Sequence, residues 1–199
     1  MEWIALRLPV ATDNPAKQIT KVSSNKRNRL SVCAQILIGN DAILLGGDME
    51  EQPTNPASFG WSAILANTGK PPGSSTAFKI PHHGSSNGHV DAVWSEMLVQ
   101  NPLAVLAPWT LAGGVLPTEE DVSRILTFTD HAFSTARLGT VNPTKKDRAV
   151  TELADATTLK RSKIHKTPGA VRARKKAGSA DPWIIELFGG ATSLDKLYP

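Results

Sequence analysis

The 199-residue sequence contains a single cysteine, Cys33, which excludes an internal disulfide. It has no apolar run near the roughly 20 residues that a membrane-spanning helix requires. The first residues lack a basic region followed by a long apolar stretch, so they do not resemble a signal peptide. These absences predict a cytoplasmic protein with no membrane partner. Cys33 itself follows Val32 in an apolar run, which favours a core position over a nucleophile.

The composition is that of an ordinary globular protein, with 40% hydrophobic and 20% charged residues. The net charge of +4 is unevenly spread, because residues 139–178 carry eleven Lys or Arg against three Asp or Glu. That stretch is therefore +8 and the remainder −4. We predict a domain over residues 1–138, a basic, flexible insertion over 139–180, and a closing strand and tail over 181–199. The basic stretch is also a candidate contact for nucleic acid.

Apolar runs bounded by turn residues predict strands over residues 30–39, 42–48, 76–81, 103–109, 131–138 and 182–190. Helical spacing of apolar residues predicts helices over 61–66, over 89–100 and from residue 118 onward. Thr118, with Asp121 three residues later, is typical of a capped helix start. A first hairpin followed by alternating strands and helices favours an α/β (α+β layered) fold with a mixed sheet and helices on its outer face.

Two short motifs contain the residues best suited to chemistry. Asp48 ends an apolar run after two glycines, where its carboxylate can project into a cleft or simply form a turn. His82 and His83 follow the apolar run of residues 76–81, and neutral imidazole is a ligand for zinc, iron or manganese. Adjacent residues of an extended strand point to opposite faces, so both rings reach one centre only if the chain turns at Gly84. The alternative interpretation of the pair is a polar surface loop.

Taken together, "LLGGDME" and "FKIPHHGSS" resemble the last two metal motifs of the metallo-β-lactamase fold, in its ComEC-like branch. The preceding "NRLSVCAQILIGNDAILLGGD" is similar to the hairpin of that branch, and the resemblance extends from about residue 28 to residue 138. It implies the C-terminal half of an αββα sandwich. It further implies a metal-dependent hydrolase that acts on phosphodiester or related ester bonds.

By this resemblance, Asp48 corresponds to a carboxylate that bridges two metal ions, and His82 and His83 supply a further ligand. The metal would be zinc, with manganese or iron as alternatives, and it would activate a water for attack on the ester. Ser85 and Ser86 are candidates for contacts with ligands or substrate, or for turn formation. The remaining histidines have no supporting pattern, and His89 is expected to start the following helix.

The principal metal motif of the family, His-x-His-x-Asp-His, is absent, and no histidine precedes His82. The opening "WIALRLPVATDNP" resembles an interior strand and loop, so we expect a truncated or split form. It would be a metallo-hydrolase only if another chain or an upstream sequence supplies the missing ligands. Two alternatives remain open: a non-catalytic interaction protein on a degenerate version of the fold, and a nucleic-acid-binding module acting through residues 139–178. A complementing N-terminal half or another protein partner would cover the apolar surface that a free-standing half exposes.

Overall fold

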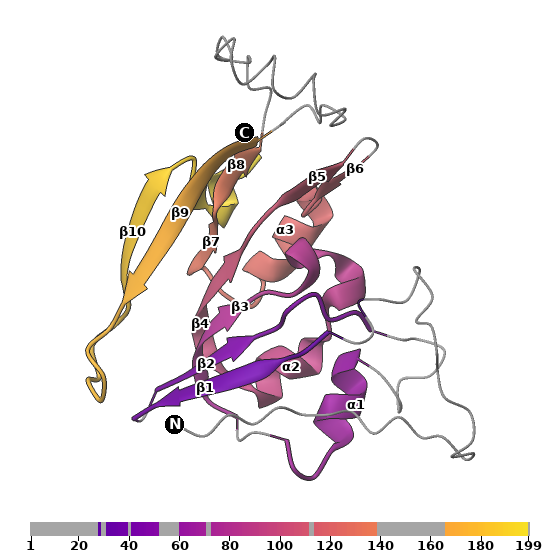
Figure 1. Ribbon diagram of the computed structural model, residues 1–199, viewed down its shortest axis with the longest axis vertical. Helices are drawn as coiled ribbons and strands as arrows, with labels where there is room; N and C mark the ends of the chain where they lie inside the picture. Colours follow the sequence, from indigo (N-terminus) through magenta and orange to yellow (C-terminus); the bar gives the residue numbers. More distant parts are fainter. Residues whose placement is uncertain are drawn as a thin grey trace, which may run out of the picture.

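The computed structural model describes residues 28, 31–39, 41–51, 60–70, 73–111, 114–138 and 166–198. Its main element is a six-stranded sheet (Figure 1) with the strand order β1-β2-β3-β4-β7-β11. These strands are β1 (Ala34–Ile38), β2 (Asp41–Leu45), β3 (Ser75–Lys79), β4 (Leu98–Leu106), β7 (Ala132–Ser134) and β11 (Thr192–Ser193). β1 and β2 form an antiparallel hairpin, whereas β2, β3, β4 and β7 run parallel to one another. The predicted α/β class with a mixed sheet is therefore confirmed.

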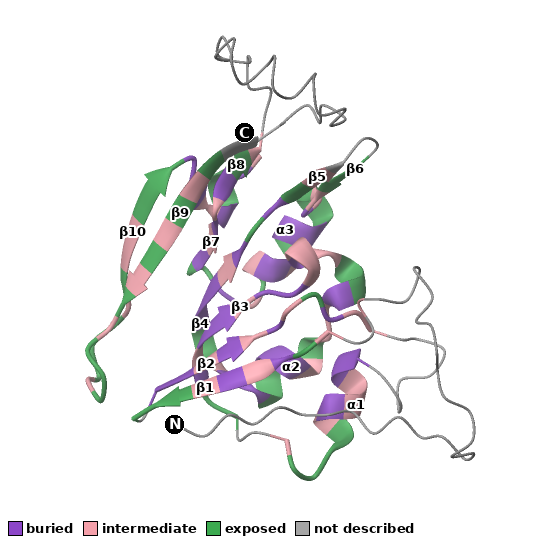
Figure 2. Cartoon of the chain, viewed as in Figure 1, coloured by how far each residue is buried: buried purple, intermediate pink, exposed green. Residues whose placement is uncertain are grey.

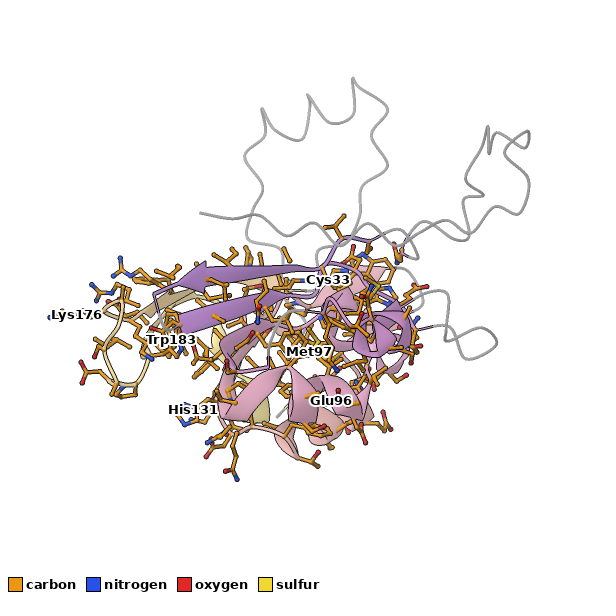
Figure 3. The ribbon with its side chains drawn as sticks, turned by 90° about the horizontal axis from the view of Figure 1, so that it is seen from below. Cys33, Glu96, Met97, His131, Lys176 and Trp183 are labelled. Atoms are coloured by element: carbon orange, nitrogen blue, oxygen red, sulfur yellow. The ribbon has the colours of Figure 1, made fainter. Side chains whose placement is uncertain are left out.

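Three helices, α1 (Gly60–Ala66), α2 (Asp91–Glu96) and α3 (Glu119–Leu126), lie on one face of this sheet. Figure 3 shows the same layering edge-on, with the strands above and the helices below. α3 begins as predicted, because the Thr118 side chain accepts a hydrogen bond from the Asp121 amide while the Asp121 carboxylate accepts one from the Thr118 amide. The helices thus close one side of the sheet over a shared core.

The core between sheet and helices is built around Phe78, which is 3% exposed. Its ring meets Trp61 of α1 edge-on at 6.2 Å between centroids, and Trp94 of α2 at 5.2 Å. Trp94 in turn stacks on Phe128, beyond the end of α3, at 5.0 Å. The buried residues shown in Figure 2 concentrate in β2, β3 and β4 and on the helix faces that cover them. One aromatic cluster therefore ties all three helices to the central strand.

A separate three-stranded antiparallel sheet contains β8 (Ala136–Leu138), β9 (Lys166–Arg174) and β10 (Ile184–Gly189). Each strand comes from a different one of the three predicted segments, 1–138, 139–180 and 181–199. Residues 139–165 lie outside the described residues, and the end of the predicted basic insertion is the nine-residue strand β9. Among its cations, Arg172 and Arg174 pair with Glu186 of β10 at 2.8 Å.

Two local predictions differ from the structure, and one hairpin was not predicted. The helix expected over 89–100 is shorter and consists of α2 alone, while residues 98–100 belong to β4. The carbonyl of Met97 accepts a hydrogen bond from the Ser75 amide at 3.0 Å, and pairing of β4 with β3 begins there. The strand expected over 131–138 is split at Thr135 into β7 and β8, which pair in different sheets. A small hairpin of β5 (Trp109–Leu111) and β6 (Gly114–Leu116) was not predicted.

Candidate functional site

The predicted site residues lie at the carboxyl ends of parallel strands. Asp48 follows β2 and the two histidines follow β3. Trp109, which was not a predicted site residue, follows the end of β4 and begins β5. Because the carboxyl ends of parallel strands share one edge of a sheet, the loops that carry these residues lie along the same edge. Ligands of open α/β sheets bind outside this edge. The structure thus confirms that each motif follows a strand, and it places the two motifs on adjacent strands.

The Gly46–Gly47 pair lets the loop after β2 close against β3. The Gly46 amide donates to the Lys79 carbonyl at 3.0 Å, and a Cβ atom on Gly46 would lie 2.9 Å from Pro81. Gly47 has a φ of +57°, which favours glycine. This tight turn leaves Asp48 exposed at the rim, while the Lys79 ammonium donates to the Gly47 carbonyl at 2.9 Å. Burial lowers the pKa of Lys79, and the negative charge of Asp48 opposes part of that effect.

His82 and His83 both adopt left-handed backbone conformations, with φ values of 45° and 56°. Two successive non-glycine residues in this region cost about 1–3 kcal/mol each, and such strain gathers at functional sites. The sequence analysis predicted that both rings can reach one metal centre only if the chain turns here, and this conformation is such a turn. Their ring centroids lie 6.2 Å apart, tilted by 46°. The two imidazoles nevertheless have different surroundings.

The ring of His83 is anchored on one side and open on the other. Its Nδ1 lies 2.7 Å from the Ala107 carbonyl, so Nδ1 carries the proton and donates. The ring also stacks on Trp109 at 6.0 Å between centroids and 19° between planes. No hydrogen-bond partner for Nε2 occurs among the described residues. A histidine whose other nitrogen is fixed by a carbonyl is oriented as metal-binding histidines are.

The ring of His82 is held from both sides. Its Nδ1 lies 2.7 Å from Oδ1 of Asn87, while its Nε2 lies 3.3 Å from Nδ2 of Asn28 and 3.4 Å from Oε1 of Glu50. The Asn28 amide also donates to the same Glu50 oxygen at 3.0 Å. The side chains of His82 and Glu50 are only 17% and 24% exposed. Residues from three separate segments of the chain therefore form one network around this imidazole.

The serines after the histidines take part in the turn through their backbones. The Ser85 amide donates to the His82 carbonyl at 3.0 Å, and the Ser86 carbonyl accepts the His89 amide at 3.2 Å. Ser85 also lines a small, partly open pocket of about 10 Å³, space for at most one water molecule. The turn role of both serines is confirmed, and their contact with ligand or substrate stays a prediction.

His89 was expected to start the following helix, but it lies in extended backbone two residues before α2. Both of its ring nitrogens are engaged. Nε2 donates to the Asp91 carboxylate at 2.7 Å, and Nδ1 accepts from the Trp94 indole at 3.3 Å. Burial lowers the pKa of His89, and the hydrogen bond to Asp91 opposes this effect. His131 is exposed beside Asp130, and His165 lies outside the described residues.

The residues at the edge fit part of a metal centre. Asp48 and His83 offer an exposed carboxylate and an open imidazole nitrogen, which are ligand types that zinc accepts. Across the described ranges, however, no three His, Cys, Asp or Glu side chains converge as one ligand set. These residues thus do not complete a centre by themselves.

The sequence did not single out Glu50, Asn28 or Asn87. Glu50 had a signal, since it lies two residues after Asp48 within the quoted "GGDME". Asn28 also had one, since it opens the quoted "NRLSVCAQILIGNDAILLGGD". Asn87 had none, and the contacts of both residues with His82, across 54 and 5 positions, depend on how the loops fold.

Comparison with known proteins identifies no family for this chain: no family model, curated protein or solved structure matches it. Within the part of the chain that the structure describes, no helix has the length and apolar character to cross a bilayer.

Proposed function

We propose that this chain is a truncated or split form of a metal-dependent hydrolase of the metallo-β-lactamase type, acting on phosphodiester or related ester bonds. The observation that carries the proposal is His83, whose imidazole is anchored by the Ala107 carbonyl with no partner for Nε2 among the described residues, and which follows β3, the strand next to the one that Asp48 follows. When bound, a divalent metal supplies an activated water and a positive charge opposite the departing oxygen.

The residues of this chain have distinct roles in the proposal. Asp48 and His83 would hold the metal, and zinc suits this mixture of carboxylate and imidazole. The Ala107 carbonyl and the Trp109 ring fix the orientation of His83. The Lys79 ammonium adds positive charge behind Asp48. The remaining ligands would come from a complementing polypeptide, because no three His, Cys, Asp or Glu side chains converge on one point among the described residues.

The test is Zn²⁺ binding by the full chain, measured by isothermal titration calorimetry. We expect binding that weakens at least tenfold in Asp48→Asn and in His83→Gly. Glycine removes the ligand and suits the left-handed backbone at φ 56°, which offsets part of the loss of the contacts with Ala107 and Trp109. His131→Ala is the matched control, because His131 is exposed and distant in the fold from β2 and β3. Equal binding in all four proteins would refute the assignment of the metal to this edge.

Catalysis is tested separately, with bis(p-nitrophenyl) phosphate as the probe. The chain alone should hydrolyse it slowly or not at all. Co-expression with the polypeptide encoded immediately upstream should give metal-dependent hydrolysis that Asp48→Asn abolishes. Hydrolysis that persists at full rate in Asp48→Asn contradicts the proposal.

A non-catalytic interaction role is the second candidate, and the apolar surface at the start of the sheet favours it. Val32, Leu37 and Ile38 are 64%, 53% and 47% exposed, and β1 ends the six-stranded sheet as an edge strand. An apolar edge strand without charge is a template for pairing with another strand. If Ile38→Lys abolishes binding to the upstream polypeptide while no metal binds, the interaction role is the better account.

A further inference from the structure

In the neutral ring that donates from Nδ1, the Nε2 atom of His82 faces the Glu50 carboxylate with no proton between them. Nδ1 lies 2.7 Å from the Asn87 side-chain oxygen, so in the neutral ring the proton is on Nδ1 and Nε2 presents a lone pair. That lone pair lies 3.4 Å from Oε1 of Glu50, which is itself an acceptor only. Two such atoms in a mostly buried place require a donor or a cation between them.

In the structure, the donor is the amide of Asn28. Its NH₂ group donates to Glu50 at 3.0 Å and approaches His82 at 3.3 Å. The Asn28 side-chain amide also carries an oxygen, which is nearly the same size as the NH₂ group and lies on the opposite side of the amide carbon. A half-turn of that group exchanges the donor for an acceptor in the same position, with no change of backbone. The cluster then presents two oxygens and one nitrogen toward a common point.

The separations among these three positions match the face of a metal coordination shell. Ligands at about 2.0–2.2 Å from one ion lie about 3.0–3.4 Å apart in octahedral or tetrahedral geometry. The observed triangle has edges of 3.0, 3.3 and 3.4 Å. Its members come from residues 28, 50 and 82, so the fold brings them together.

We propose that Asn28, Glu50 and His82 form a mononuclear site for a divalent cation, which the Asn28 amide closes when no ion is bound. One imidazole nitrogen, one carboxylate and one amide oxygen together favour an ion that accepts both oxygen and nitrogen, such as Mn²⁺. Partial exposure of His82 and Glu50 leaves room for water to complete the shell. The site is separate from the centre proposed above, which uses Asp48 and His83, and it does not depend on that function.

The support of the triad is local and rigid. The His82 amide donates to the Gly47 carbonyl at 3.3 Å, and the Glu51 amide donates to the Asn87 carbonyl at 2.6 Å. Gly88 packs directly beneath, where a Cβ atom would lie 3.0 Å from the Cβ of His82. These contacts fix the loops after β2 and β3 against each other, so Glu50 and His82 are preorganised toward an ion.

The test measures Mn²⁺ binding by the full chain, with calorimetry and with the electron paramagnetic resonance signal of free Mn²⁺. The chain should bind one ion, and Glu50→Gln should weaken binding at least tenfold. Asn28→Asp is the sharpest variant, because it places a carboxylate 3.0 Å from Glu50. It should lower the melting temperature in EDTA, raise it in Mn²⁺, and tighten Mn²⁺ binding at least tenfold.

The control is His131→Ala, an exposed histidine outside the triad, which should leave this Mn²⁺ site intact. If Asn28→Asp lowers the melting temperature equally with and without Mn²⁺, and Glu50→Gln does not alter binding, the triad is a hydrogen-bonded network and the inference fails. If Mn²⁺ binding is lost in Asp48→Asn and His83→Gly but not in Glu50→Gln, the ion belongs to the other centre. That outcome overturns this inference and supports the proposed function.

Discussion

Arg124 connects α3 to the histidine loop, and its removal should destabilise the protein. Its Nη1 donates to Asp121 at 2.8 Å and its Nη2 donates to the Gly84 carbonyl at 2.7 Å. The side chains of Arg124 and Asp121 are 23% and 6% exposed. The Asp121 carboxylate is therefore nearly enclosed, and this cation lies beside it. Replacement of Arg124 by Met keeps an unbranched side chain in place of the aliphatic part of arginine and removes both hydrogen bonds.

The expected loss follows from these contacts. A hydrogen bond to a charged group contributes about 1.5–3 kcal/mol. Breaking a fully buried pair costs about 3–5 kcal/mol, and the partial exposure of Arg124 reduces that figure. We expect Arg124→Met to lower the free energy of unfolding by about 2–3 kcal/mol. For a protein of this size, that corresponds to a melting temperature lower by about 5–10 °C.

The assay is urea and thermal unfolding followed by circular dichroism, with Ser123→Ala as the control. Ser123 is exposed on the same helix, so its change should stay within about 0.5 kcal/mol. Hydrogen exchange adds a local readout. The Gly84 amide bonds to the Pro81 carbonyl and should exchange faster in Arg124→Met. If Arg124→Met is no less stable than Ser123→Ala, the contact is an ordinary surface pair and the reasoning is wrong.

Three further predictions concern the core and its titratable groups. Burial raises the pKa of the Cys33 thiol to about 12, so the thiol should resist Ellman's reagent at pH 8 in the native protein and react in urea; fast native labelling would contradict this. Burial lowers the pKa of His89 below its ordinary value of 6.5, so near that pH the unfolded state binds more protons than the folded state. The free energy of unfolding should therefore fall between pH 7.5 and pH 5.5, and less so in His89→Gln; identical slopes would refute the effect. Phe78→Ala removes the edge-on contacts with Trp61 and Trp94 and should cost about 3–5 kcal/mol in urea unfolding, clearly more than Phe78→Leu.

Elements defined by local signals were predicted well from the sequence. The hairpin of β1 and β2 follows from two apolar runs around a turn, and the start of α3 follows from the capping residues Thr118 and Asp121. Errors occurred where tertiary pairing overrides local preference. Residues 98–100 continue a helical pattern, but pairing with β3 makes them strand. Residues 131–138 form one apolar run, but its two halves, β7 and β8, pair in two different sheets.

The candidate site shows the same division. Asp48, His82 and His83 could be selected because their residue types and their places after apolar runs are visible in the sequence. Which nitrogen of each imidazole is engaged could not be predicted, because it depends on the Ala107 carbonyl for His83 and on Asn87 for His82. These contacts depend on how separate loops pack.

The sequence by itself determined the mixed α/β class, the order of the main strands and the position of the acid and histidine motifs at strand ends. Hydrophobic periodicity and turn residues are local properties, so they can be seen in a single sequence. Only the tertiary structure distinguished the two histidines: His83 is anchored with one open nitrogen, while His82 is enclosed with Asn28 and Glu50. The reason is that the positions of side chains from residues 28, 50 and 82 relative to one another are set by parallel strand pairing and loop closure, and no local pattern encodes those distances.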